Sequence, residues 1–323
     1  MFFIFFANIN NRGINEGEIV YMLIKPREKS ISYLILESLY YRKSLSFQDK
    51  KRYENQVKGF DGEQQFDHFI NYSQQQGFVV NDLFLSSKET NYQFDSILIL
   101  NQQVNIYGVK NYTGAYRYED GTLFSKTGYS LQDPISQVNR KKSYLHNRLL
   151  TEGYSHNINA YVVFINPDFY IYKLPPTDSI LFSGQLERHF NEVTRLTQPM
   201  SVQDKKLTQS LVNQHNENYR PDNLPSYHFK ELKKGILCAN CFSFDSTDTR
   251  QTRICASCGY KEKITDAIYR SMLEFQVLFP ELPISVSTIY EWCGGVYTIA
   301  RIRRLLNKKM TKHSNGPMTY YKN

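Results

Sequence analysis

Two pairs of cysteines constrain the fold of this chain more than any other feature of its sequence. Cys238 and Cys241 form one C-x-x-C pair, Cys255 and Cys258 form a second, and thirteen residues separate the pairs. Each pair offers two thiolates on one tight turn, and a hairpin between them would bring all four sulfurs together. The spacing therefore predicts that these four cysteines bind one Zn²⁺ ion tetrahedrally.

The predicted zinc site has a structural role, because four thiolates leave no coordination position open for a water molecule. Residues 236–262 around it resemble a zinc ribbon. Disulfide bonds are the alternative, but five cysteines are an odd and sparse set, which is typical of a reducing, cytoplasmic location. The fifth cysteine, Cys293 beside Trp292, is expected to fill apolar space.

The positive charge of the chain is concentrated near its C-terminus. The net charge is +8, and segment 293–323 contains seven basic residues and no acidic residue. A solvated surface usually mixes both signs, so this segment favours a polyanionic partner, first of all DNA. No apolar run approaches the ~20 residues of a membrane helix, so no membrane partner is expected. The candidate nucleic-acid-binding residues are Arg301, Arg303, Arg304, Lys308, Lys309 and Lys312.

Hydrophobic spacing in the same region predicts three helices followed by a hairpin. Their expected ranges are 265–279, 285–292, 297–309 and 311–321. This order resembles a winged helix-turn-helix module over 263–323, with the third helix as the recognition helix. Ile299, Ile302 and Leu306 of that helix are expected to face the core. A basic helix that packs without binding a ligand remains the alternative.

The middle of the chain alternates between helical and strand patterns, which predicts an α/β fold with a mixed sheet flanked by helices. A polar connection is expected over 42–58, and a helix is expected to start at Asp61. Asp133 and Pro134 predict the start of another helix, as its cap and its first residue. The main strands expected are 78–85, 94–100, 104–110 and 160–165, and the remaining helices are 31–41, 183–196 and 202–216.

These patterns divide the chain into five parts. An N-terminal tail and helix occupy 1–50, and Met22 is the expected true start, because Glu16-Gly17-Glu18 can be encoded by a ribosome-binding sequence. The remaining parts are the α/β core with a helical extension over 51–217, a linker over 218–235, the zinc ribbon over 236–262 and the basic module over 263–323.

The strand over 104–110 ends in Gly108-Val109-Lys110. Alternate side chains of a strand share a face, so positions 108 and 110 point to the same side. Nucleases of the PD-(D/E)XK type have an acid at the first of these positions and a lysine at the second. The acid holds a divalent cation, and the lysine stabilises charge or orients the attacking water. Asp95, on the preceding strand, is placed to supply a second carboxylate.

Several further motifs occur in the order and spacing of one family. They are Gly59-Phe60-Asp61-Gly62-Glu63, Phe94-Asp95, Val109-Lys110-Asn111-Tyr112-Thr113-Gly114, and Pro134 with Gln137. With them, residues 58–150 resemble the NERD (nuclease-related domain) family, a branch of the PD-(D/E)XK nuclease superfamily. The resemblance implies a restriction-endonuclease-like core, with Mg²⁺ or Mn²⁺ as the cofactor. It also implies a site lined by Glu63, Asp95, position 108, Lys110 and Gln137.

The chain departs from this family pattern at Gly108, which stands where the acid is expected. Glycine has no ligand atom, so metal affinity falls unless another carboxylate, with Glu63 the first candidate, replaces it. Two functions therefore remain open. One is a metal-dependent nuclease or DNA-processing protein that uses Asp95, Glu63 and Lys110. The other is a catalytically inactive DNA-binding or regulatory protein that retains the nuclease fold.

Overall fold

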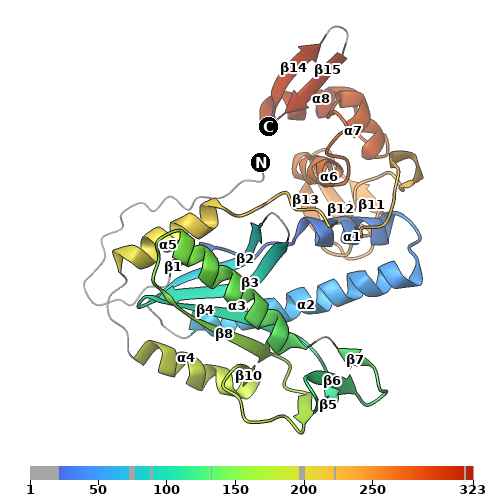
Figure 1. The fold of residues 1–323 in the computed structure, drawn as a ribbon. Helices are drawn as coiled ribbons and strands as arrows, with labels where there is room; N and C mark the ends of the chain where they lie inside the picture. Colours follow the sequence, from blue (N-terminus) through green and yellow to red (C-terminus); the bar gives the residue numbers. More distant parts are fainter. Residues whose placement is uncertain are drawn as a thin grey trace. The chain divides into compact units, whose positions relative to one another are not determined.

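The computed structural model describes residues 22–72, 77–87, 90–131, 133–195, 201–221, 223–315 and 318–322 (Figure 1). The described chain forms two compact units. Residues 30–54 and 220–323 form the first, which we call the cysteine unit. Residues 22–29 and 55–219 belong to the second, which we call the sheet unit. The expected N-terminal tail before Met22 lies outside the described residues.

The sheet unit is built on a six-stranded mixed sheet, which confirms the predicted α/β fold. In sheet order its strands are β1 (Met22–Lys25), β2 (Phe78–Ser86), β3 (Asn91–Leu100), β4 (Gln103–Lys110), β8 (Asn157–Phe164) and β10 (Ile180–Phe182). The pairs β2–β3 and β3–β4 are antiparallel, and the other three pairs are parallel. The candidate site lies on β3 and β4, the two central strands, which each pair with a strand on both sides.

Helices cover both faces of this sheet. Successive residues of a strand point to opposite sides, so neighbouring residues contact different helices. Ile106 belongs to a buried cluster with Val138 of α3, whereas its neighbour Tyr107 belongs to a cluster with Phe66 of α2. Asp133 caps α3 as predicted, since its carboxylate accepts hydrogen bonds from the backbone N–H groups of the first turn. The helices are α2 (Phe47–Tyr72), α3 (Pro134–Thr151), α4 (Leu186–Arg195) and α5 (Val202–Asn213).

A smaller four-stranded sheet continues from the end of β4. Its strands, in sheet order, are β7 (Ser130–Leu131), β6 (Thr122–Ser125), β5 (Gly114–Glu119) and β9 (Phe169–Tyr172). The turn between β5 and β6 contains Asp120 and Gly121, both in the left-handed region of φ. Such a turn matches the twist of an antiparallel hairpin.

The prediction of a polar connection over 42–58 followed by a helix from Asp61 is wrong. One continuous helix, α2, begins at Phe47 and runs through this segment. Ser46 starts it, because its Oγ accepts a hydrogen bond from the N–H of Asp49 at 3.1 Å. Segment 42–58 contains no glycine, and its polar composition is the reason why a connection was expected. Gly59 and Gly62 follow it inside the helix, where tertiary packing overrides their low helix propensity.

One of these glycines, Gly62, is required by a close contact. A Cβ atom added to Gly62 would lie 2.5 Å from Cβ of Asn111, whereas a Cβ added to Gly59 would meet no atom within 4 Å. We therefore expect Gly62→Ala to destabilise the sheet unit by about 1–3 kcal/mol through overpacking. Gly59→Ala is the matched control and should stabilise the helix by about 0.5–1 kcal/mol. Chemical denaturation measures both, and equal stabilities of the two variants would contradict the contact.

The described residues of the cysteine unit contain four complete α-helices, the first two turns of α2 and two small sheets. Its elements are α1 (Ile31–Arg42), β11 (Ser246–Asp248), β12 (Thr252–Cys255), β13 (Lys261–Lys263), α6 (Ile264–Leu278), α7 (Val286–Trp292), α8 (Ile299–Lys309), β14 (Thr311–Asn315) and β15 (Met318–Lys322). The three C-terminal helices and the hairpin after them agree with the predicted ranges. Ile35 and Leu39 of α1 belong to the same buried cluster as Trp292, a packing that the hydrophobic spacing did not indicate.

The described chain crosses between the units after residues 29, 54 and 219, and the last crossing lies inside the segment expected as a linker. Leu232, near the end of that segment, is buried in the core of the cysteine unit. The expectation that Ile299 faces the core is wrong, because this side chain is 47% exposed. Ile299 is the first residue of α8 and lies beyond the buried stripe, in which Leu305 joins the two predicted residues.

Arg42 at the end of α1 is a buried cation in the cysteine unit. Its Nε and Nη2 atoms donate hydrogen bonds to the two carboxylate oxygens of Glu274, at 2.8 and 2.7 Å. The guanidinium also lies 4.0 Å from the centre of the Trp292 ring. A single carboxylate and an aromatic face thus compensate this charge.

Candidate functional site

The V-K-N-Y-T-G string shapes the chain where β4 ends. Asn111 Nδ2 donates a hydrogen bond to the carbonyl of Lys58 at 2.8 Å, and Asn111 Oδ1 accepts one from Asn166 Nδ2 at 3.1 Å. Gly114 has a φ of +86°, which favours glycine, and its N–H bonds to the carbonyl of Asp168. The asparagine therefore ties β4 to α2 and to the segment after β8, and this explains why Gly62 lies so close to it.

Asp95 is buried on β3 at the same end of the sheet. Its Oδ2 accepts a hydrogen bond from the N–H of Val109 at 2.8 Å, and its Oδ1 lies 3.2 Å from Nζ of Lys141. Burial by itself would raise the pKa of Asp95, but the charges of Lys141 and Lys110 and the bond from Val109 outweigh it and hold this pKa below its usual value. Asp95 is therefore ionised at neutral pH.

Gly108 lies beside Asp95 on the neighbouring strand. Ser96 pairs with Tyr107, so the next two residues, Asp95 and Gly108, follow on adjacent strands and their side-chain positions face α3. A Cβ atom added to Gly108 would lie 3.8 Å from both Val138 Cγ2 and the carbonyl oxygen of Tyr161, which is ordinary van der Waals contact. The backbone thus leaves room for a side chain, but the residue present offers no ligand.

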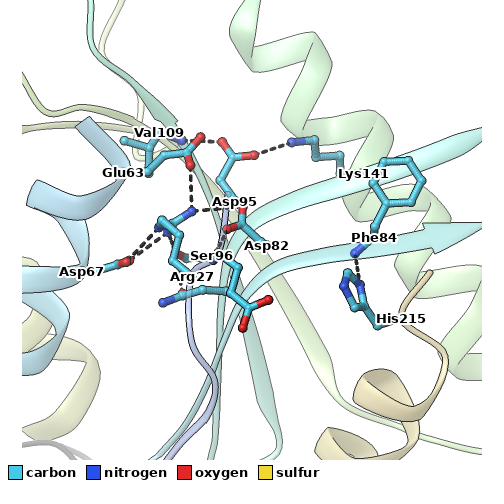
Figure 2. A network of polar contacts seen from close by, with 12 residues as sticks. Arg27, Glu63, Asp67, Asp82, Phe84, Asp95, Ser96, Val109, Lys141 and His215 are labelled. Carbon is cyan, nitrogen blue, oxygen red and sulfur yellow. Dashed lines mark hydrogen bonds and ion pairs between the residues drawn. The ribbon is translucent and has the colours of Figure 1, made fainter. Parts of the chain in front are cut away.

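Glu63, the residue expected to replace the missing acid, is bonded to an arginine. Nη1 of Arg27 donates a hydrogen bond to Oε2 of Glu63 at 2.8 Å. Figure 2 shows the carboxylates of Glu63 and Asp95 converging at this end of the sheet. Burial first, and then the charge of Asp95, raise the pKa of Glu63 to about 8, although Arg27 opposes the rise. Glu63 therefore tends to hold a proton at neutral pH.

Arg27 also contacts two further acids that the sequence motifs did not single out, Asp67 and Asp82 (Figure 2). Asp67 follows Glu63 by four residues on α2, a spacing that places both on one helix face. Asp82 has a φ of +49°, in the left-handed region, and burial raises its pKa to about 6. Arg27 itself has no sequence signal, because it follows the short edge strand β1.

The remaining predicted site residues lie around Asp95 in different ways. Lys110 is half-buried at the end of β4, and its charge acts on Asp95. Gln137 is half-buried in the first turn of α3. Lys141, four residues after Gln137 on α3, forms an ion pair with Asp95. Tyr144, one turn further on, stacks on Tyr92 with ring centres 4.0 Å apart.

A divalent cation does not fit the site in this arrangement. Asp95 and Glu63 are already bonded to Lys141 and Arg27, and position 108 supplies no third oxygen. Within the described ranges, the four cysteines are the only group of three or more Cys, His, Asp or Glu residues whose ligand atoms all lie within 4.8 Å of one another. Hard cations such as Mg²⁺ and Mn²⁺ require several oxygen ligands together.

The outer side of α3 borders an open groove of about 780 Å³. The helix contains no acidic residue between Pro134 and Thr151, but it has four basic ones. Two of these, Arg140 and Arg148, line the groove together with the Tyr92–Tyr144 pair and with Glu152, which forms an ion pair with Arg148. Amides, hydroxyl groups and aromatic rings thus lie beside positive charge on this surface.

The four paired cysteines gather as the spacing predicts. Sγ atoms lie 3.7 Å apart between Cys238 and Cys258, and 3.5 Å apart between Cys241 and Cys255. Each C-x-x-C turn ends in a residue with left-handed φ, Phe242 at 59° and Gly259 at 72°. The four-sulfur set, with short strands between the pairs, fits a zinc ribbon. Cys293 is buried elsewhere in the core, where burial raises the pKa of its thiol to about 12.

The basic residues near the C-terminus lie on α8 and the hairpin after it. Arg303, Arg304 and Lys308 are exposed on α8, and Lys312 is exposed on β14. Arg301 is half-buried, because its Nη2 bonds to the carbonyl of Arg250. Nζ of Lys309 lies 5.0 Å from the centre of the Tyr269 ring. None of the helices in the described part of the chain is long and apolar enough to cross a bilayer.

Comparison with protein families gives a match over the middle of the chain. Residues 58–165 match the family model of the nuclease-related domain (NERD), which confirms the resemblance indicated by the sequence motifs. The matched segment is less than half of the chain, and it runs from α2 to the end of β8. Comparison with curated proteins and with solved structures gives no significant match.

Proposed function

We propose that this chain, whose residues 58–165 form a nuclease-related domain, is a DNA-binding protein that retains the nuclease fold without hydrolysing phosphodiester bonds. One observation carries the proposal. The acid position is Gly108, and the two nearby carboxylates, Asp95 and Glu63, are each bonded to a protein cation. A site in this state binds no catalytic metal ion, whereas the basic surfaces of both units suit a polyanion.

The C-terminal part of the cysteine unit supports DNA binding. Three helices followed by an antiparallel hairpin suit a winged helix-turn-helix module, with α8 as the recognition helix. Its exposed arginines and lysines suit phosphate contacts, which position a protein on DNA without reading its sequence. The zinc ribbon would hold the base of this module in shape, and its thiolates suit a reducing location such as the cytoplasm.

The groove along α3 supports a second contact in the sheet unit. Arg140 is exposed there, and α3 has no acid between its ends. Exposed basic and amide side chains bind phosphate, and aromatic rings such as Tyr92 stack on unpaired bases.

DNA binding by α8 is tested by fluorescence anisotropy at several salt concentrations. Arg303→Ala/Arg304→Ala should weaken binding of double-stranded DNA about tenfold or more, because two charge-assisted contacts are lost. The slope of log K against log salt should fall by about 2, since each phosphate contact contributes about 0.9.

Lys205→Ala/Lys206→Ala is the matched control, because it removes two exposed charges from α5 in the sheet unit. This variant should bind like the native protein. Equal losses in both variants would mean that net charge alone, and no surface of α8, drives binding. A native protein without any affinity for DNA would overturn the proposed function.

A metal-dependent nuclease is the second candidate function. Asp95 favours it, because its lowered pKa and its place beside Lys110 suit the carboxylate and lysine of such a site. Glu63 would have to leave Arg27 and lose its proton to act as the second ligand. Mg²⁺ or Mn²⁺ would then supply the charge that stabilises a departing phosphate oxygen.

A further inference from the structure

We propose that Arg27 is a resident cation that supplies the positive charge of a divalent metal ion and keeps such an ion out of the acidic end of the sheet. The inference rests on the proposed non-hydrolytic function and deepens it. It concerns a residue outside the segment that matches the nuclease-related domain, which begins at residue 58.

The hydrogen bonds of Arg27 use its whole guanidinium. Nε and Nη2 bond to the two oxygens of Asp67, both at 2.8 Å. Nη1 bonds to Glu63 at 2.8 Å and to Asp82 at 3.3 Å, and Nη2 also bonds to Ser96 Oγ at 2.8 Å. A guanidinium has five N–H donors, so these five bonds account for all of them.

Burial makes this arrangement difficult to displace. The side chain of Arg27 is 3% exposed, and those of Glu63, Asp67 and Asp82 are 19, 17 and 14% exposed. Hydrogen bonds and charges from these acids outweigh burial and raise the pKa of Arg27, which stays charged. A buried cation with matched partners is strongly held, and removing it leaves carboxylates without compensation.

Arg27 follows the edge strand β1, which places it near the acids. Strand β1 pairs in parallel with β2 at the edge of the sheet, with Met22 opposite Phe78 and Leu23 opposite Val79. Two residues after β1, Arg27 reaches the acids at the end of the sheet, where Asn81 and Ser96 form a hydrogen-bonded pair. The segment before the family match therefore completes the charge balance of the site.

Two roles of Arg27 make different predictions. If Arg27 only stabilises the fold, its removal lowers stability and metal ions do not correct the loss. If Arg27 replaces a metal ion, its removal frees the carboxyl groups of Glu63, Asp67 and Asp82 to bind Mn²⁺, an ion that prefers oxygen ligands. Any proton that these groups hold would be released on binding. Recovery of stability by Mn²⁺ therefore separates the two roles.

The experiment measures the melting temperature of the full-length, zinc-loaded protein with and without Mn²⁺. Arg27→Gln should melt below the native protein, and Mn²⁺ should raise its melting temperature by about 5–10 °C when present at about 100 times its Kd. The native protein should show no such rise. Arg42→Gln is the matched control, because it removes a buried arginine that faces one carboxylate only, and Mn²⁺ should leave its melting temperature unchanged.

An equal rise in the native protein and in Arg27→Gln would overturn the proposal, as would no rise in Arg27→Gln. If Arg27→Gln does not fold, electron paramagnetic resonance of Mn²⁺ with the native protein decides. The proposal predicts that the native protein binds no Mn²⁺ at this site. A bound Mn²⁺ signal in the native protein that disappears in Asp95→Asn would overturn the proposal. Neither readout involves DNA. A protein that fails to bind DNA would therefore contradict the proposed function without affecting the test of Arg27.

Discussion

Cys255→Ser is expected to abolish the predicted zinc binding of the cysteine unit and to unfold that unit at ordinary temperatures. The four Sγ atoms all lie within 4.8 Å of one another, so each thiolate would supply one of the four ligands of a zinc ion. Structural zinc contributes about 10–16 kcal/mol of folding free energy in zinc-finger peptides. The net stability of a whole domain is about 5–15 kcal/mol, so losing the zinc would remove most or all of it. The hydrophobic core around Trp292 would compensate only part of this loss of stability.

The measurement combines zinc content by atomic emission with thermal unfolding. Cys293→Ala is the control, because this cysteine is buried beside Trp292 and its thiol is not among the four that gather. That variant should keep one zinc ion per chain and lose only about 1 kcal/mol, as is usual for a small core truncation. A Cys255→Ser protein that keeps its zinc and its stability would contradict the predicted metal site.

Gly108→Glu is expected to create metal-dependent DNA cleavage. The backbone leaves ordinary contact distance around an added Cβ, and the new carboxylate would face the same side as Asp95. Two carboxylates on adjacent strands would then bind Mg²⁺ or Mn²⁺ without Glu63 and Arg27. We expect cleavage to rise on the order of 100-fold over the native protein, since even residues that only support metal ligands change affinity by 10–100-fold.

Gly108→Gln is the matched control, because glutamine has the size of glutamate without its charge. It should remain inactive, and Lys110→Ala in the Gly108→Glu protein should abolish the new activity. A folded Gly108→Glu variant that neither binds Mn²⁺ nor cleaves DNA would show that this end of the sheet is no longer organised as a nuclease site.

The sequence predicts those parts of the fold that depend on local patterns. Alternating apolar residues gave the strands that flank Gly108, and Asp133 with Pro134 gave the start of α3. Cysteine spacing gave the four-sulfur cluster. The first half of α2 was missed because segment 42–58 is polar, and a polar segment gives little helical periodicity.

The charge balance of the site was not predictable in the same way. Arg27 and Glu63 are 36 residues apart in the chain, and no periodic pattern links a residue after an edge strand to an acid on α2. Lys141 of α3 likewise pairs with Asp95 of β3, which lies 46 residues away in the chain. Long-range pairing of charges depends on the finished fold, whereas strands and caps depend on neighbouring residues.

The most direct test of this account is cleavage of plasmid and single-stranded DNA by the native protein in Mg²⁺ or Mn²⁺, measured beside Asp95→Asn. Asp95 is the carboxylate that any metal-dependent reaction at this site would require. The account predicts that the native protein binds DNA and produces no more nicked or shortened product than Asp95→Asn. Cleavage by the native protein that Asp95→Asn abolishes would contradict it and would identify the chain as an active nuclease.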